Sequence, residues 1–277
     1  MTADAPRVSV GWLALREPAD AAARAPELVE PIRRHLAGRD RTVIHDLGGG
    51  TGSMGRWLAP RLPGPQHWIT YDRDAGLLTH LAAGGVGTTP ADADGTAVTV
   101  ETRLRDITRL PAGDLAGASL ITASALLDML TADEIERIVA ACAGAGCPTL
   151  LTGSVIGQVE FTPPDPLDAE IAAAFNAHQR RALGGRCLLG PDAVDATVDA
   201  FHRRGVPVLV RPGPWRLGAD QADLLSEWLT GWVRAACEQR PDLAGPAAGY
   251  LRRRRAELAD GHLQAVIHHT DLLAGCD

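Results

Sequence analysis

Apolar residues along the chain fall into two patterns, short continuous runs and longer stretches at helical spacing. The short runs lie at 42–47, 67–72, 96–104, 118–124, 148–156, 206–210 and 262–273. Each has the length and composition of a β-strand, and helical stretches separate most of them. This alternation predicts an α/β fold in which helices cover both faces of a mostly parallel sheet.

Three segments depart from this rhythm and predict additions to the sheet. Residues 1–40 have a largely helical pattern with one apolar face, and we expect them to cap the sheet edge or the mouth of a site. Residues 158–186 and 219–259 carry helical patterns after the fifth and sixth strands. We therefore expect a helical cap followed by one domain over residues 41–277 with two helical insertions.

A glycine-rich loop follows the first strand. Four glycines fall within residues 48–52, and a helical pattern begins at Met54. Glycine suits such a loop because a Cβ would block positive φ values and the approach of a bound cofactor. Residues 50–55 match the dinucleotide pattern G-x-G-x-x-G, and residues 46–52 match a second pattern, D-x-G-x-G-x-G. A third interpretation is that the glycines only pack a helix close to a sheet.

Asp46 distinguishes the two cofactor patterns. It ends the first strand, where its carboxylate would face a bound cofactor. A carboxylate there repels a pyrophosphate but attracts the ammonium and sulfonium groups of S-adenosylmethionine. The stretch from His45 to Gly52 therefore resembles the first motif of the class I, seven-stranded S-adenosylmethionine-dependent methyltransferases.

This resemblance implies a seven-stranded, Rossmann-like sheet with an antiparallel last strand, and S-adenosylmethionine as the cofactor. Asp72 ends the second strand, where a carboxylate accepts hydrogen bonds from ribose hydroxyls, although it could instead cap the next helix. By the resemblance, Asp106 and Ile107 contact the adenine amino group and ring; a solvated loop aspartate is the alternative. The expected cofactor-binding residues are Asp46, Gly48, Gly50, Thr51, Gly52, Asp72, Arg73, Asp106, Ile107 and Ser124.

The acceptor end of the site is less well defined. Ser124 and Asp128 follow the fourth strand, whose carboxyl end faces the ligand crevice of an open α/β sheet, but an aspartate buried at a helix start is also plausible. His178 is the best general-base candidate because imidazole titrates near neutral pH, although a lone helical histidine often only packs. We predict catalytic roles for His178 and Asp128. We predict substrate binding by Arg16, Asn176 and Arg180, because unpaired guanidinium groups suit an anionic substrate.

Composition limits the classes of molecule that the chain is expected to bind. The 277 residues include 27 arginines, no lysine and 34 acidic residues, a formal net charge of −7, which disfavours nucleic acid. The run Arg252–Arg255 would point all around a helix, so it predicts a solvated helix paired with acidic residues. We find no apolar run of bilayer length, no secretory signal and no metal-ligand spacing among five cysteines. We expect a cytoplasmic protein that acts on a small molecule without membrane or metal, and a homodimer stays open.

Together these features predict methyl transfer from S-adenosylmethionine to a small molecule, at an oxygen, nitrogen or carbon that the sequence does not identify. An NAD(P)-dependent oxidoreductase using Gly50, Gly52, Gly55 and Asp72 is one alternative, but it leaves Asp46 and Asp106 without a role. A cofactor-binding protein without catalysis is the other.

Overall fold

The computed structural model describes residues 8–84, 93–96 and 98–276. Within them, the main path of the sheet has the order β3-β2-β1-β4-β5-β10-β8, and the short β9 (Trp215–Leu217) pairs with β10. The path consists of β1 (Thr42–Leu47), β2 (Gln66–Asp72), β3 (Thr99–Leu104), β4 (Leu120–Ser124), β5 (Thr149–Thr162), β8 (Val208–Pro212) and β10 (Gln264–Ala274). Neighbouring strands along the path from β3 to β5 are parallel to each other. Strand β10 is antiparallel to both of its neighbours, β5 and β8. The predicted fold class is confirmed.

The register of the parallel strands determines where the loops meet. Leu47 at the end of β1 lies opposite Tyr71 of β2 and Ala123 of β4. The carboxyl ends of these three strands are therefore level. The loops that follow them gather at one edge of the sheet, which is where open α/β sheets bind ligands.

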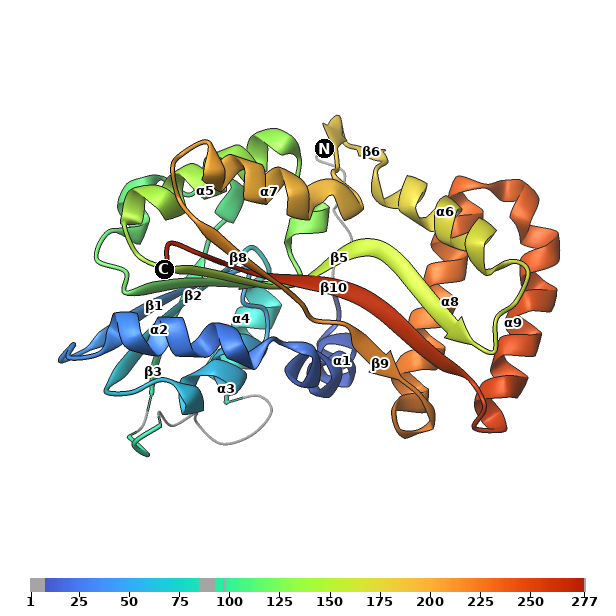
Figure 1. Cartoon of the computed structure of the whole chain (residues 1–277), viewed down its shortest axis with the longest axis horizontal. Helices are drawn as coiled ribbons and strands as arrows, with labels where there is room; N and C mark the ends of the chain where they lie inside the picture. Colours follow the sequence, from blue (N-terminus) through green and yellow to red (C-terminus); the bar gives the residue numbers. More distant parts are fainter. Residues whose placement is uncertain (1–7, 85–92, 97, 277) are drawn as a thin grey trace.

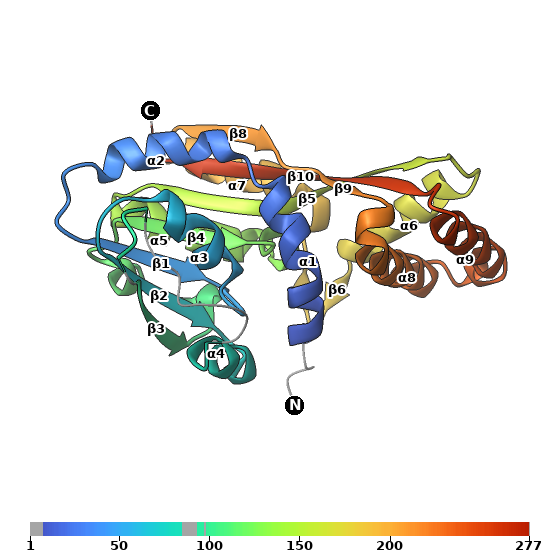
Figure 2. The same cartoon turned by 90° about the horizontal axis from the view of Figure 1, so that it is seen from below.

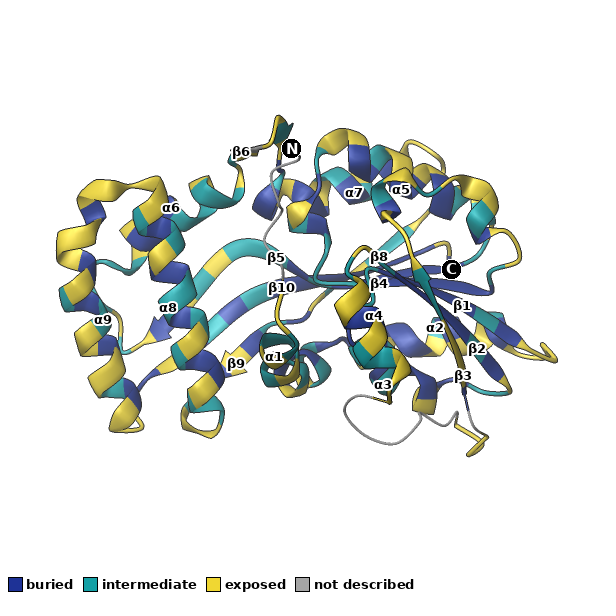
Figure 3. Cartoon of the chain, turned by 180° about the vertical axis from the view of Figure 1, so that it is seen from behind, coloured by how far each residue is buried: buried dark blue, intermediate teal, exposed yellow. Residues whose placement is uncertain are grey.

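Helices pack on both faces of the sheet (Figure 1). One face carries α2 (Val29–Leu36), α3 (Ser53–Leu58) and α4 (Ala75–Ala82), and the other carries α5 (Ala132–Ala145) and α7 (Ala193–His202). Ile32 and Trp57 are buried with Ile44 on the first face, and Ile135 and Phe201 are buried on the second. Figure 3 shows buried residues along the central strands and exposed residues on the outer helix surfaces. Burying one apolar stripe per helix stabilises this arrangement.

Strands β5 and β10 run past the rest of the sheet and support a group of helices that we call the helical lobe (Figures 1 and 2). It consists of α6 (Asp168–Gln179), α8 (Ala222–Gln239) and α9 (Ala244–Ala259). Its core is aromatic: the ring centroid of Trp232 lies 5.5 Å from that of Phe161 and 6.5 Å from that of Tyr250. Helix α1 (Val10–Ala23) packs against β9, α3 and α8, so it lies between the two halves of the molecule (Figure 2).

The observed β5 is longer than the strand predicted at 148–156. Residues 159–162, expected in a helical insertion, still pair with β10, as Phe161 does with Ala265. Gly153 and Gly157 adopt φ of +66° and +75°, which lets the strand bend and continue where pattern analysis predicts an end. The insertion proper holds α6 and a hairpin of β6 (Ala182–Leu183) and β7 (Arg186–Cys187).

The arginine run in α9 corrects another expectation. Arg252, Arg253 and Arg255 are exposed, but Arg254 is fully buried and therefore not part of a solvated helix face. Its guanidinium donates to both carboxylate oxygens of Asp168 at 2.7 Å. Burial of a charge is tolerable here because the charge is paired within the lobe.

Among the described helices, none is both long enough and apolar enough to cross a bilayer.

Candidate functional site

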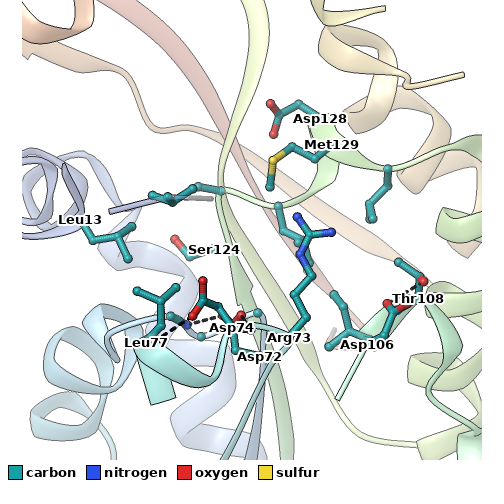
Figure 4. A pocket seen from close by; sticks show the side chains of 18 of the residues that line it. Leu13, Asp72, Arg73, Asp74, Leu77, Asp106, Thr108, Ser124, Asp128 and Met129 are labelled. Atoms are coloured by element: carbon teal, nitrogen blue, oxygen red, sulfur yellow. Dashed lines mark hydrogen bonds between the residues drawn. The ribbon is translucent and has the colours of Figure 1, made fainter. Parts of the chain in front are cut away.

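A cavity of about 1260 Å³ lies at the carboxyl ends of β1, β2 and β4. The loops after these strands form one side of it, and residues of α1, α6 and the segment 128–130 form the other. Figure 4 shows Asp72, Asp74 and Asp106 on the side opposite Asp128 and Met129. The cavity therefore has two ends, which we call the loop end and the roof.

The glycine loop depends on left-handed backbone conformations. Gly48, Gly50 and Gly52 have φ of +67°, +55° and +86°, values that favour glycine. Gly48 and Gly50 line the cavity, whereas Gly52 precedes α3 with Leu81 against it, where it shapes the loop. The loop is thus set by conformation at each of these positions and leaves its backbone at the cavity surface.

Asp46 lies under this loop, at the edge of the cavity that it helps to line. It is 1% exposed, and its Oδ1 accepts a hydrogen bond from Thr122 at 2.7 Å. Its buried Oδ2 has no hydrogen-bond partner among the described residues. Burial raises the pKa of Asp46 to about 6, although the bond from Thr122 and the charge of Arg24 oppose that change. The site thus contains an incompletely satisfied carboxylate beside the loop.

The next two strands each supply a carboxylate to the loop end. Asp72 accepts from the Gly50 amide at 3.0 Å and from the Asp74 amide at 2.9 Å, so it braces the glycine loop. Asp74, not Asp72, caps α4. Asp106 accepts from the backbone and side chain of Thr108, and Ile107 beside it is buried, with both residues lining the cavity. Thr51 and the exposed Arg73 also line it, and Figure 4 shows Arg73 reaching into the space.

A buried arginine ties this end to the N-terminal helix. Arg24, directly after α1, donates to the hydroxyls of Ser53 and Ser124, each at 3.2 Å. Ser124 lines the cavity, and the next residue, Ala125, has a strained φ of +51°. Arg24 is 4% exposed and lies near the charges of Asp20 and Asp46, so it balances buried negative charge.

The roof is formed around Asp128. Burial raises the pKa of its carboxyl to about 6, and Gln179 of α6 donates to it, with Nε2 3.4 Å from Oδ2. Leu13 of α1, Met129 and Phe175 add apolar surface. A carboxyl in such surroundings can take up and release a proton near neutral pH.

His178 lines the roof, but both of its ring nitrogens are engaged. Nδ1 lies 3.1 Å from Nη1 of Arg181, and Nε2 lies 3.1 Å from Oε2 of Glu238. Because a guanidinium only donates, Nδ1 must accept and Nε2 must carry the hydrogen. Burial and Arg181 lower the pKa of His178. The geometry therefore gives the predicted base no free lone pair.

The three residues predicted to bind substrate lie in different surroundings. Arg16 lines the cavity, held by Asp20 at 2.9 Å. Asn176 and Arg180 are outside the described lining: Asn176 donates to the Gly157 carbonyl at 2.8 Å, and Arg180 pairs with Asp192 at 2.6 Å on the surface. Their positions correct the expectation, because the phase of α6 turns both side chains away from the cavity.

Sequence reasoning missed several contributors to this site. Gly49 could have been found as part of the glycine run. Arg181 neighbours a predicted residue, and only the exact end of α6 reveals that it lines the cavity. No local sequence pattern marks Arg24 as part of the site, because its partners Ser53 and Ser124 are 29 and 100 residues away in the chain.

Comparisons with known proteins extend these observations. No protein-family model and no curated protein matches the chain. Among solved structures, the YcgJ protein from Bacillus subtilis has a TM-score of 0.52 at 13% identity, covering 91% of this chain and 99% of that one. The cyclopropane synthase MmaA2 from Mycobacterium tuberculosis has a TM-score of 0.51 at 14% identity, covering 96% and 94%. A SAM-dependent methyltransferase from Methanosarcina mazei has a TM-score of 0.50 at 11% identity, covering 87% and 95%. The chain therefore has the fold of the class I S-adenosylmethionine-dependent methyltransferases.

Proposed function

We propose that this chain is an enzyme that binds S-adenosylmethionine and transfers its methyl group to a small-molecule acceptor. One observation carries the proposal: a single cavity joins the glycine loop over the Asp46 carboxylate to Asp72 and to Asp106 with Ile107. These groups come from the ends of three neighbouring strands. Their chemistry suits a cation, a ribose and an adenine in that order.

The residues fit the cofactor in charge and in shape. The Oδ2 atom of Asp46, which accepts no hydrogen bond from the described residues, contributes negative potential under the loop, and this favours a cationic methionine portion. Asp72 already accepts two amide hydrogens and retains acceptor capacity for ribose hydroxyls. The buried Ile107 offers an apolar surface to a ring, and the carboxylate of Asp106 lies beside it.

The chain's own residues would mainly hold and orient the reactants. S-adenosylmethionine supplies a methyl group on an activated sulfonium leaving group, so alignment accounts for much of the catalysis. The strained Ala125 and the bond from Arg24 to Ser124 hold the segment after β4 in place. The roof would exclude water with its apolar residues and place Asp128 near the acceptor.

The nicotinamide alternative gains no support from this architecture. Dinucleotide-binding sheets of the Rossmann type have the order 3-2-1-4-5-6, with parallel strands. Here the antiparallel β10 is inserted between β5 and β8. The buried carboxylate of Asp46 would also repel a pyrophosphate on the loop.

Two measurements test the proposal. Calorimetric titration of the full chain is expected to give binding of S-adenosylmethionine and S-adenosylhomocysteine and no binding of NADH or NADPH. Incubation with methyl-labelled S-adenosylmethionine and a small-molecule extract is then expected to yield a labelled product. Preferential NADPH binding would refute the cofactor assignment, and cofactor binding without labelled product from any extract would favour a non-catalytic role.

A further inference from the structure

Arg181 is a cationic group at the roof for which the described part of the chain provides no acidic partner. Its Nη1 donates to Nδ1 of His178 at 3.1 Å and to the His178 carbonyl at 2.8 Å. No carboxylate among the described residues forms an ion pair with it. The other guanidinium groups on this side are neutralised, Arg16 by Asp20 at 2.9 Å and Arg186 by Glu134 at 2.6 Å.

The surroundings of Arg181 explain what this charge could do. It is half-buried at the cavity wall, directly beyond α6, and only one of its terminal nitrogens is engaged in the contacts given above. A guanidinium presents donors in a planar fork that matches a carboxylate or a phosphate. An anionic group on the acceptor would satisfy donors that the chain leaves available.

Asp128 limits the atom that can be methylated. Its carboxyl is enclosed beside Gln179, and Gln179 lies two residues before Arg181 in the chain. A carboxylate nucleophile at this point would meet the negative charge of Asp128 and be repelled. A hydroxyl would instead donate a hydrogen bond to it. A cationic amine is disfavoured because the guanidinium groups of Arg16 and Arg181 line the same cavity.

We propose that the methyl acceptor is a small anionic hydroxy compound whose anionic group binds Arg181 and whose hydroxyl donates to Asp128. This inference rests on the proposed methyltransferase function. In the transfer, the hydroxyl oxygen forms the new bond to the methyl carbon as the carbon–sulfur bond breaks. The bonding pair stays on sulfur, which becomes a neutral thioether, and the hydroxyl proton passes to the Asp128 carboxylate. The product is a methyl ether that keeps its anionic group.

A binding experiment with matched compounds tests the anionic group. The full chain, saturated with S-adenosylhomocysteine, is titrated with aliphatic and aromatic hydroxy acids and with the neutral amide of each. At least one hydroxy acid is expected to bind at least ~10-fold more tightly than its amide, since a charge-assisted bond to a partly buried guanidinium is worth about that factor. Equal affinity for acid and amide, or no binding by any hydroxy acid, overturns the inference.

Neighbouring arginines provide a matched pair of variants. Arg181→Gln is expected to reduce the preferred acid to the affinity of its amide. Arg180→Gln, which alters the surface pair with Asp192, is expected to leave the affinity within about 2-fold. Equal losses in the two variants, or none in Arg181→Gln, contradict the assignment of Arg181.

Asp128→Asn tests the hydroxyl. It is expected to retain binding of the preferred acid within about 3-fold and to slow its methylation ~100-fold or more, as loss of a general base does. Methylation by Asp128→Asn at the wild-type rate would overturn the role of Asp128 as the base. Formation of a methyl ester on the carboxylate would overturn the assignment of the hydroxyl as the acceptor. Failure of the wild type to bind S-adenosylhomocysteine would refute the proposed function itself. Normal cofactor binding without acid preference refutes only the acceptor assignment.

Discussion

The Oδ2 atom of Asp46 lies 2.3 Å from the position that a Cβ on Gly49 would occupy. The loop can therefore fold over the carboxylate because residue 49 has no side chain. Thr70 restricts the same space, with its Cγ2 at 2.5 Å. This contact links the strand tip to the loop and explains a glycine whose backbone conformation alone does not require one.

Gly49→Ala is expected to destabilise the protein and disturb the loop. Neither neighbour is the far end of a flexible side chain, so the loop has to move, and overpacking of this kind costs about 1–3 kcal/mol. Urea denaturation measures the free energy of unfolding. Gly231→Ala is the control: this glycine lies within α8 with nothing within 4 Å, and alanine there should add about 0.5–1 kcal/mol. Equal stability changes in the two variants would contradict the packing argument.

Asp72→Asn is expected to weaken S-adenosylhomocysteine binding about 10- to 100-fold. The amide replaces a charged acceptor of ribose hydroxyls and also disturbs the bond from the Gly50 amide, and bonds to charged groups are worth about 1.5–3 kcal/mol. Calorimetry measures the dissociation constant. Asp133→Asn, an exposed residue in the first turn of α5, should bind like the wild type. Unchanged affinity in Asp72→Asn would remove this carboxylate from the cofactor site.

The sheet was predictable because each strand has a local signal. Apolar runs mark β1, β2 and β4, a glycine loop follows β1, and the family that the motif around Asp46 resembles implies the order of the whole sheet. The extension of β5 beyond residue 156 was not, because Gly157 reads as the end of a strand in the sequence. The strand continues past this glycine only because β10 is there to pair with it.

The site was predictable where it follows strand ends and unpredictable where it depends on helix phase. Asp72 and Asp106 lie at strand ends, so their approach to the cavity follows from a parallel register. Arg180 and Arg181 differ by one position at the end of α6, yet one pairs with Asp192 and the other lines the cavity. Only tertiary packing of the helical lobe decides between them.

Asp128→Asn is expected to gain stability relative to the wild type as the pH rises. Burial raises the pKa of Asp128 to about 6 from an ordinary value of 3.8. Between these values the folded state holds a proton that the unfolded state releases, so the wild type loses stability as the pH rises through this window. The Asp128→Asn variant does not lose stability in this way, because an asparagine side chain does not ionise. The difference in unfolding free energy between variant and wild type should therefore increase by about 1 kcal/mol from pH 5 to pH 7.5.

Urea denaturation at the two pH values measures that difference. Comparing variant with wild type cancels the opposing contribution of buried histidines, such as His45 and His269, whose pKa values burial lowers to about 4. Those groups add stability as the pH rises. A variant curve parallel to the wild-type curve would show that the Asp128 carboxyl is as easily ionised in the folded chain as in the unfolded one.

Arg254→Met is expected to destabilise the helical lobe by about 3–5 kcal/mol, because it leaves the partly buried Asp168 without its cationic partner. The guanidinium also donates to Glu257 and to the Pro163 carbonyl, so four protein oxygens lose donors at once. Arg252→Met, two positions earlier on the exposed face of the same helix, should change the unfolding free energy by less than about 0.5 kcal/mol. Urea denaturation at pH 7.5 compares the two. Similar effects would mean that Arg254 contributes no more than a solvated arginine of the same run, whereas a large difference would identify Arg254 as the charge that joins α9 to α6.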